Sequence, residues 1–181
     1  MFAIICDGRG ILPKIANFKL IGTMNSNVET FSNQLRVRAC GVLIDKNRIL
    51  MAKHLGFGKG GYLWIPPGGG VKHGETIQSA IEREFWEETG LRAEIRSFLF
   101  VNEFIQKPLH AIEFFFLVKN VGGFLKVGTD PELNDEHQMI SEVRFLSIDD
   151  IRSEGESKVH SRFCDISSFD ELLRIKGFFY S

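Results

Sequence analysis

The chain has 181 residues, a length typical of one compact domain. Hydrophobic residues make up 44% of the chain and charged residues 25%, which is the composition of an ordinary globular protein. The formal net charge of −1 provides no global positive field to hold a polyanion, so nucleic acid is not an expected partner.

The three cysteines, Cys6, Cys40 and Cys164, are widely spaced and include no CxxC pair. This pattern argues against a disulfide framework and against a zinc site, and it predicts a reduced, cytoplasmic protein. No apolar run approaches the roughly 18 residues that a membrane span needs. A membrane is therefore not an expected partner either.

Residues 1–34 show no clear hydrophobic period, and residues 23–33 are polar in the way that is typical of a linker. We interpret residues 1–34 as a loosely attached N-terminal extension. An alternative is a native start at Met24, which would place residues 1–23 outside the native protein. Residues 35–181 are then expected to form the single folded domain.

Regular structure is predicted from residue 37 onward. Strands are expected at Val37–Ile44, Arg48–Lys53, Tyr62–Ile65, Ala93–Phe104, His110–Lys119 and Glu142–Leu146. Helices are expected at Thr76–Thr89, from Ser147 onward, and over residues 167–175. Loops are expected at Leu55–Gly61, at Gly68–Gly70 and over residues 121–137. Strands outnumber helices, which indicates an α+β fold.

The predicted helix Thr76–Thr89 carries an unusual arrangement of charge. At about 100° per residue, Glu84 and Glu88 share the apolar face of the helix, and Glu87 lies at its edge. Trp86 points the opposite way. Three carboxylates clustered on a packed face repel one another, so they take up protons or recruit a cation. Oxygen ligands suit a hard divalent ion, Mg²⁺ or Mn²⁺, better than zinc.

The alternative is a solvated, glutamate-rich helix in which Arg83 and Glu87 form only a surface i,i+4 pair. The preceding Gly68–Gly70 triplet favours the metal interpretation. Glycines let the backbone approach a ligand closely, and a loop that feeds a helix N-terminus presents N–H groups to phosphate oxygens. We therefore expect Gly69 and Gly70 to contact a substrate anion beside the cation, an arrangement that suits a metal-bridged diphosphate.

The segment from Gly69 to Leu91 resembles the Nudix signature, G-x5-E-x7-R-E-U-x-E-E-x-G-U, in which U is a bulky apolar residue. The matching positions are Gly69, Glu75, Arg83, Glu84, Phe85, Glu87, Glu88, Gly90 and Leu91. Phe85 is a soft departure, because an aliphatic residue is more usual there. The likeness extends more loosely over residues 37–151.

This resemblance to the MutT-type Nudix hydrolases implies an α/β/α sandwich with a mixed sheet, in which the signature forms a loop-helix-loop. It implies that Glu87 and Glu88 are the principal metal ligands. Glu84 would be a further ligand or the base that activates water. Arg83 would orient a signature glutamate through a salt bridge, and Gly68 would offer its carbonyl oxygen to the metal.

Some members of the family also use an acidic residue on a later loop as a ligand or a general base. We favour Glu136 for this role over the other candidates, Asp130, Glu132 and Asp135. Phe57 lies in a glycine-flanked loop and is a candidate for stacking on a nucleobase. The histidines show no ligand spacing and are expected at the surface or in loops: His54, His73, His110, His137 and His160.

Together these features predict a Mg²⁺-dependent pyrophosphohydrolase, with Mn²⁺ as the alternative ion. Its substrate would be a nucleoside diphosphate linked to another moiety, or a (d)NTP. Two alternatives are a nucleotide-sensing module without catalysis and an RNA 5′-end pyrophosphohydrolase. The first usually carries a DNA-binding domain, for which residues 1–34 are too short, and the near-neutral charge disfavours the second. A homodimer is left open.

Overall fold

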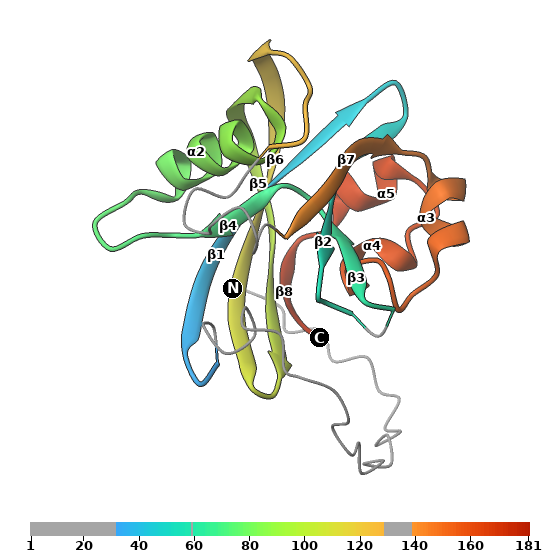
Figure 1. Cartoon of the computed structure of the whole chain (residues 1–181). Helices are drawn as coiled ribbons and strands as arrows, with labels where there is room; N and C mark the ends of the chain where they lie inside the picture. The colour runs from blue at the N-terminus through green and yellow to red at the C-terminus, as the bar shows by residue number, and fades with distance from the viewer. Residues whose placement is uncertain (1–31, 59, 129–138) are drawn as a thin grey trace.

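A mixed β-sheet forms the middle layer of the protein, and helices cover both of its faces (Figure 1). The structure is a computed structural model that describes residues 32–58, 60–128 and 139–181. Helix α2 (Ile77–Thr89) lies on one face of the sheet. The other face carries three shorter helices, α3 (Ile148–Glu154), α4 (Ser161–Cys164) and α5 (Phe169–Arg174). The predicted α+β class is confirmed. None of the helices in these ranges is long and apolar enough to cross a membrane.

The sheet has eight strands in the described part of the chain. They are β1 (Leu35–Asp45), β2 (Arg48–Leu55), β3 (Tyr62–Ile65), β4 (Gly68–Gly70), β5 (Leu91–Gln106), β6 (Leu109–Gly123), β7 (Ile140–Leu146) and β8 (Gly177–Tyr180). The main order is β3-β2-β1-β6-β5-β8, with β4 beside β1 and β7 beside β2. The β1–β6 and β5–β8 pairs are parallel, whereas the β1–β2 and β5–β6 pairs are antiparallel.

Strand β1 links the functional segments of the sheet. Arg38 on this strand pairs with Gly70 of β4 on one side and with Glu113 of β6 on the other. Because these positions are in register, the beginning of the signature segment lies next to β1 and close to the middle of β6. Side chains from distant parts of the sequence therefore meet around Arg38.

Alternate residues of β1 face two separate hydrophobic cores, as expected for a strand covered on both sides. Ala39 and Leu43 belong to the core beneath α2. Cys40 and Val42 belong to the core beneath the three shorter helices. Aromatic rings fill much of the second core, where Phe100 and Phe115 stack with ring centroids 4.7 Å apart. The sheet is thus fixed between two packed layers.

The structure differs from the sequence-based prediction in three places. Gly68–Gly70 is not a loop but strand β4, because its backbone pairs with β1 from Arg38 to Cys40. Residues 121–123, expected to begin a loop, continue strand β6. Helix α4 and strand β8 were not predicted. Of the rest of the expected loop, residues 124–128 are in neither a helix nor a strand, as predicted, and residues 129–137 lie outside the described residues.

Gly68 has a backbone conformation that disfavours any other residue. Its φ is 153°, and a Cβ at this position would lie 2.3 Å from the Ala39 carbonyl oxygen. We expect Gly68→Ala to destabilise the protein by about 1–3 kcal/mol, because β1 must shift away. For a domain of this size, each kcal/mol lowers Tm by roughly 2–4 °C.

Gly70→Ala is the matched control, since the nearest atom to its added Cβ is the end of the Arg36 side chain at 3.4 Å. Thermal unfolding of the two variants and the wild type makes the comparison. Equal Tm values for Gly68→Ala and Gly70→Ala would contradict the predicted clash.

Candidate active site

Helix α2 has defined ends and one inward face. Thr76 caps its N-terminus by accepting a hydrogen bond from the Ser79 N–H, and Gly90 ends it in the left-handed region at φ 68°. Glu88 is among the buried residues of the helix, whereas Trp86 is 48% exposed. The helix therefore carries a carboxylate into the interior of the protein.

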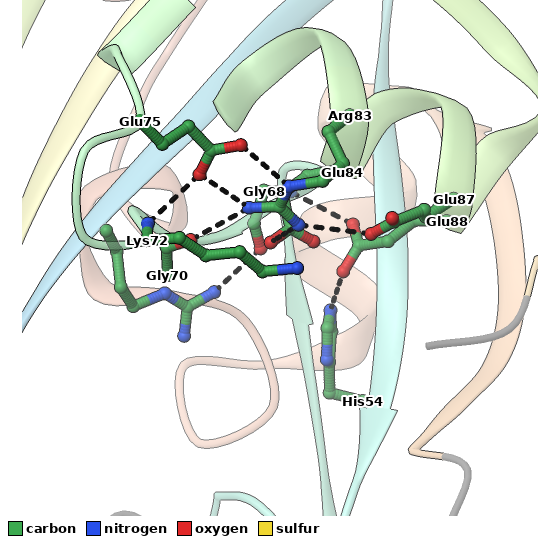
Figure 2. A network of polar contacts seen from close by, with 10 residues as sticks. His54, Gly68, Gly70, Lys72, Glu75, Arg83, Glu84, Glu87 and Glu88 are labelled. Atoms are coloured by element: carbon green, nitrogen blue, oxygen red, sulfur yellow. Dashed lines mark hydrogen bonds and ion pairs between the residues drawn. The ribbon is translucent and has the colours of Figure 1, made fainter. Parts of the chain in front are cut away.

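Arg83 is the centre of the polar network beside this helix (Figure 2). Its Nε and Nη2 donate to the two carboxylate oxygens of Glu75 at 2.8 and 2.9 Å. Its Nη1 donates to Glu84 Oε1 at 2.7 Å and to Glu87 Oε2 at 3.1 Å. Its Nη2 also reaches the Gly70 carbonyl oxygen at 3.0 Å. One guanidinium thereby fixes the directions of two of the three clustered carboxylates.

Glu88 is held by the sheet. The Gly68 N–H donates to Glu88 Oε2 at 2.9 Å, and His54 Nε2 lies 3.8 Å from Glu88 Oε1 (Figure 2). The adjacent Gly69 leaves room for the Glu84 carboxylate, because a Cβ on residue 69 would lie 2.3 Å from Glu84 Oε1. The glycines of β4 therefore allow two carboxylates of α2 to approach the backbone closely.

The glutamates around Arg83 differ in their affinity for a proton. Burial raises the pKa of Glu84, and the hydrogen bond from Arg83 opposes that shift only in part. The hydrogen bonds from Arg83 hold the pKa of Glu75 well below its usual range, at about 2. Glu84 therefore accepts a proton more readily than an ordinary glutamate, whereas Glu75 is a permanently charged partner for Arg83.

The donor groups suit a hard divalent cation, although the side chains are not yet arranged around one. Within the described ranges, no three acidic, His or Cys side chains are already spaced to hold a metal ion. Glu84 and Glu87 each give one oxygen to Arg83 and keep a second, and Glu88 and the Gly68 carbonyl lie close by. An all-oxygen set of this kind fits Mg²⁺ or Mn²⁺. Binding requires the carboxylates to turn toward one another.

A cleft opens beside this network. Arg38 and His54 connect the two, because Arg38 Nη2 donates to the Gly68 carbonyl oxygen at 3.0 Å and His54 lies next to Glu88. Phe57 and Phe104 add aromatic surface to the cleft. Its other lining residues are Arg36, Leu63, Ile65, Leu109, His110, Ala111, Glu113 and His160. The cleft thus combines cationic and aromatic groups, which suit a phosphate and a planar ring respectively.

Glu113 is the centre of a second, buried polar network in the lining of the cleft. Its Oε2 accepts hydrogen bonds from His160 Nε2 at 2.8 Å and from Asn102 Nδ2 at 3.1 Å, and its Oε1 lies 3.9 Å from Arg38 Nε. The Arg162 N–H donates to His160 Nδ1 at 3.3 Å, so the other ring nitrogen, Nε2, faces Glu113. Burial would raise the pKa of Glu113, but these neighbours outweigh it and hold the pKa at about 2.

The predicted site residues of the signature lie together, whereas other predictions need correction. Gly68, Gly69, Gly70, Arg83, Glu84, Glu87 and Glu88 meet where β4 contacts α2, and Phe57 lies in the adjoining cleft. The glycine triplet does not directly precede the helix N-terminus, because β4 ends at Gly70 and α2 begins at Ile77. Glu136 and the other acidic candidates of residues 130–136 lie outside the described residues.

Two of the histidines expected at the surface or in loops are buried: His54, which lies in strand β2 and contradicts that prediction, and His160, which lies in the loop just before α4. His54 and His160 are only 8% and 5% exposed. Sequence reasoning also missed Asn102 and Glu113, which are buried as well. The His160–Glu113 hydrogen bond joins residues 47 positions apart, so no local pattern signals it. The one available hint for Glu113 was its place as the single charged residue in the apolar run Ala111–Val118 of β6.

Comparison with known families identifies the fold and its signature. The model of the NUDIX domain family matches residues 34–164, which is well over half of the chain. The chain therefore belongs to the NUDIX domain family. The match begins just before β1 and ends with α4, so it includes the signature helix and the residues that line the cleft.

Two relatives show how the chain compares with whole proteins. The ADP-ribose pyrophosphatase of Methanocaldococcus jannaschii is 36% identical over 92 residues, which are 50% of this chain and 54% of that protein. The 8-oxo-dGDP phosphatase NUDT18 of Mus musculus is 30% identical over 135 residues, which are 72% of this chain and 39% of that protein. The chain thus spans about half or less of the length of these curated relatives.

Solved structures are similar in fold. A MutT NUDIX hydrolase from Burkholderia pseudomallei is 25% identical, with a TM-score of 0.54 over 65% of this chain and 86% of that chain. A NUDIX hydrolase from Nitrosomonas europaea is 22% identical, with a TM-score of 0.56 over 69% of this chain and 80% of that chain.

The Glu113 network predicts a specific loss of stability in acid. Because the pKa of Glu113 is about 2 in the fold, below the ordinary glutamate pKa of 4.5, its ionised form stabilises the protein fully above pH 4.5. This stabilisation disappears as the pH falls toward 2. We expect Glu113→Gln to lower the free energy of unfolding by on the order of 2–3 kcal/mol at neutral pH, and by less as the pH falls below 4.5.

Urea unfolding at a series of pH values between 7 and about 3 measures this difference. Glu142→Gln is the control, since it removes a half-exposed carboxylate from strand β7. A difference between wild type and Glu113→Gln that stays constant across the series would show that the charge of Glu113 does not stabilise the fold.

Proposed function

We propose that this protein is a metal-dependent hydrolase that cleaves the diphosphate bond of a nucleotide. Its ion is Mg²⁺, with Mn²⁺ as the alternative. Its substrate is a nucleoside diphosphate linked to another moiety, or a (d)NTP. The observation that supports this proposal most is a cluster of three carboxylates beside a cleft lined by two arginines. Glu88 accepts the Gly68 N–H, and Arg83 holds Glu84 and Glu87 next to it. Carboxylates provide for the cation, and guanidinium groups provide for the phosphate anion.

The relatives support this class of reaction. The two names, ADP-ribose pyrophosphatase and 8-oxo-dGDP phosphatase, both describe hydrolysis of a nucleotide compound at phosphate. They differ in the compound. The proposal for this chain therefore names the diphosphate bond and a nucleotide, and leaves the remaining group to experiment.

The reaction is a displacement by water at phosphorus. Glu84, Glu87, Glu88 and the Gly68 carbonyl would hold a divalent ion, which would supply positive charge for the phosphate oxygens and acidify a nearby water when bound. The water oxygen forms a bond to phosphorus, and the bond from that phosphorus to the bridging oxygen breaks, so the electron pair leaves with the departing phosphate. Glu84, whose pKa is raised, takes the water proton, and Glu136 is the alternative base. The products are a nucleoside monophosphate and X-phosphate, or pyrophosphate from a triphosphate.

The other groups have positioning roles in this proposal. Arg83 keeps Glu84 and Glu87 aimed at the ion, and the backbone of Gly69 and Gly70 approaches the substrate phosphates. Phe57 stacks on the base in the cleft. We further propose that residues 35–181 act as one catalytic domain in the cytoplasm, with a nucleotide as its partner.

A substrate panel tests the activity and its need for metal. The panel contains (d)NTPs, ADP-ribose, NADH, nucleotide sugars, dinucleoside polyphosphates and 5′-triphosphorylated RNA, with phosphate-containing products as the readout. We expect turnover of at least one nucleotide in millimolar Mg²⁺ or Mn²⁺, loss of turnover in EDTA, and recovery when Mg²⁺ is added in excess. Full turnover in EDTA would contradict the proposal. Binding without turnover would favour a sensing module, and turnover of RNA alone would favour the 5′-end activity.

The contribution of Glu88 can be separated from the general charge of the helix. We expect Glu88→Gln to lower kcat at least about 10²-fold, because it removes a ligand charge that stabilises the transition state. The amide oxygen of glutamine can still accept the Gly68 N–H, so the fold is retained. Glu82→Gln is the matched control, since Glu82 is on the same helix but exposed and bonded only to Gln78 in the described contacts. Similar kcat values for the two variants would refute the assignment of Glu88.

A further inference from the structure

Arg38 holds the same carbonyl oxygen that the proposed function assigns to the metal. Its Nη2 donates to the Gly68 oxygen at 3.0 Å, while the Gly68 N–H donates to Glu88. Gly68 is thus bonded through its oxygen to the Arg38 guanidinium and through its nitrogen to the Glu88 carboxylate. A divalent ion bound to the Gly68 oxygen and Glu88 would come close to the Arg38 guanidinium, and like charges at such short range repel strongly.

The Arg38 guanidinium has only part of its hydrogen-bonding capacity in use. Its Nε is buried and has no hydrogen-bond partner among the described residues. Glu113 Oε1 lies 3.9 Å from Nε, which is beyond hydrogen-bonding distance, and the other oxygen of Glu113 is occupied by His160 and Asn102. Buried donors are rarely left unpaired, so an acceptor that comes to Nε in the cleft is favoured.

A phosphate group would offer acceptors to both Nε and Nη2 of Arg38, whereas the Gly68 carbonyl accepts only from Nη2. The Nε and Nη2 atoms of a guanidinium form an edge that binds two oxygens of one phosphate in parallel. Arg38 lines the cleft, so a diphosphate entering there meets that edge. Exchanging the Gly68 oxygen for a phosphate would satisfy both nitrogens, and it would release the Gly68 oxygen toward the ion.

We propose that Arg38 is a gate on the Gly68 carbonyl: it disfavours the metal ion in the empty site and moves to the diphosphate when substrate binds. This inference rests on the proposed function, because it takes Gly68 and Glu88 as metal ligands. This movement of Arg38 makes binding of the ion and of the diphosphate cooperative, since each favours the position in which Arg38 has left the Gly68 oxygen. Arg38 acts here as a positioning residue, through Gly68 as well as on the substrate.

The first test measures Mn²⁺ binding to the full chain without nucleotide, from the loss of the EPR signal of free Mn²⁺. We expect Arg38→Met to bind Mn²⁺ about tenfold more tightly than the wild type, within the usual range of coupling between sites. Arg38→Lys keeps the positive charge and should stay near the wild-type Kd. Arg36→Met is the matched control, because it removes an arginine from the same strand and the same cleft. Circular dichroism and Tm verify that each variant is folded.

The second test measures binding of the non-hydrolysable analogue α,β-methylene-ADP by calorimetry, with and without saturating Mn²⁺. We expect Mn²⁺ to tighten binding of the analogue to the wild type, and this tightening factor to fall about fivefold or more in Arg38→Met. An unchanged Mn²⁺ Kd in Arg38→Met, or an equal change in Arg36→Met, would overturn the gate while leaving the proposed function intact. Absence of Mn²⁺ binding in every variant, with and without the analogue, would overturn the metal site and the gate together.

Discussion

The site depends on one arginine that joins three parts of the chain. Arg83 bonds Glu75 in the loop before α2, Glu84 and Glu87 on α2 itself, and the Gly70 carbonyl on strand β4. Its side chain is only 20% exposed, so these ion pairs are shielded from water more than surface pairs are. The loop, the helix and the strand are therefore fixed relative to one another before any ligand arrives. The mutual repulsion of the carboxylates is offset by the same cation.

Glycines are the second constraint, because their lack of a side chain lets α2 approach the sheet. A Cβ on Gly41 would lie 2.4 Å from the ring of Phe85, and one on Gly69 would overlap the Glu84 carboxylate. Close packing of Phe85 thus takes the place of the aliphatic residue that is more usual in the signature. The carboxylates of α2 reach β4 because the strands beneath them present backbone there. The geometry of the candidate site and the packing of the core are consequently set by the same contact between helix and sheet.

The sequence allowed prediction of features whose causes are local. Thr76 and Gly90 mark the ends of α2, and the helical period places Glu88 inward and Trp86 outward. The sequence did not reveal β4, because a glycine triplet has no side-chain pattern and becomes a strand only by pairing with β1. The buried network of Glu113, His160 and Asn102 was also missed, since its members come together only when β5, β6 and the chain before α4 pack. Burial of a polar group follows from tertiary contacts rather than from its neighbours in sequence.

In the proposed function, the features with local causes and those that arise from tertiary contacts have different roles. The chemistry resides in a contiguous segment, in which spacing alone brings Arg83 and the glutamates together. Recognition would reside in the cleft, whose polar side chains come from segments far apart in sequence. One of them, Glu113, is bonded to Asn102, which also bonds Ser181. Arg38 is in contact with both parts, through Gly68 on one side and next to Glu113 on the other. A substitution near the C-terminus would therefore alter the cleft while leaving the signature intact, and it would reach the proposed metal site through Arg38 and His54.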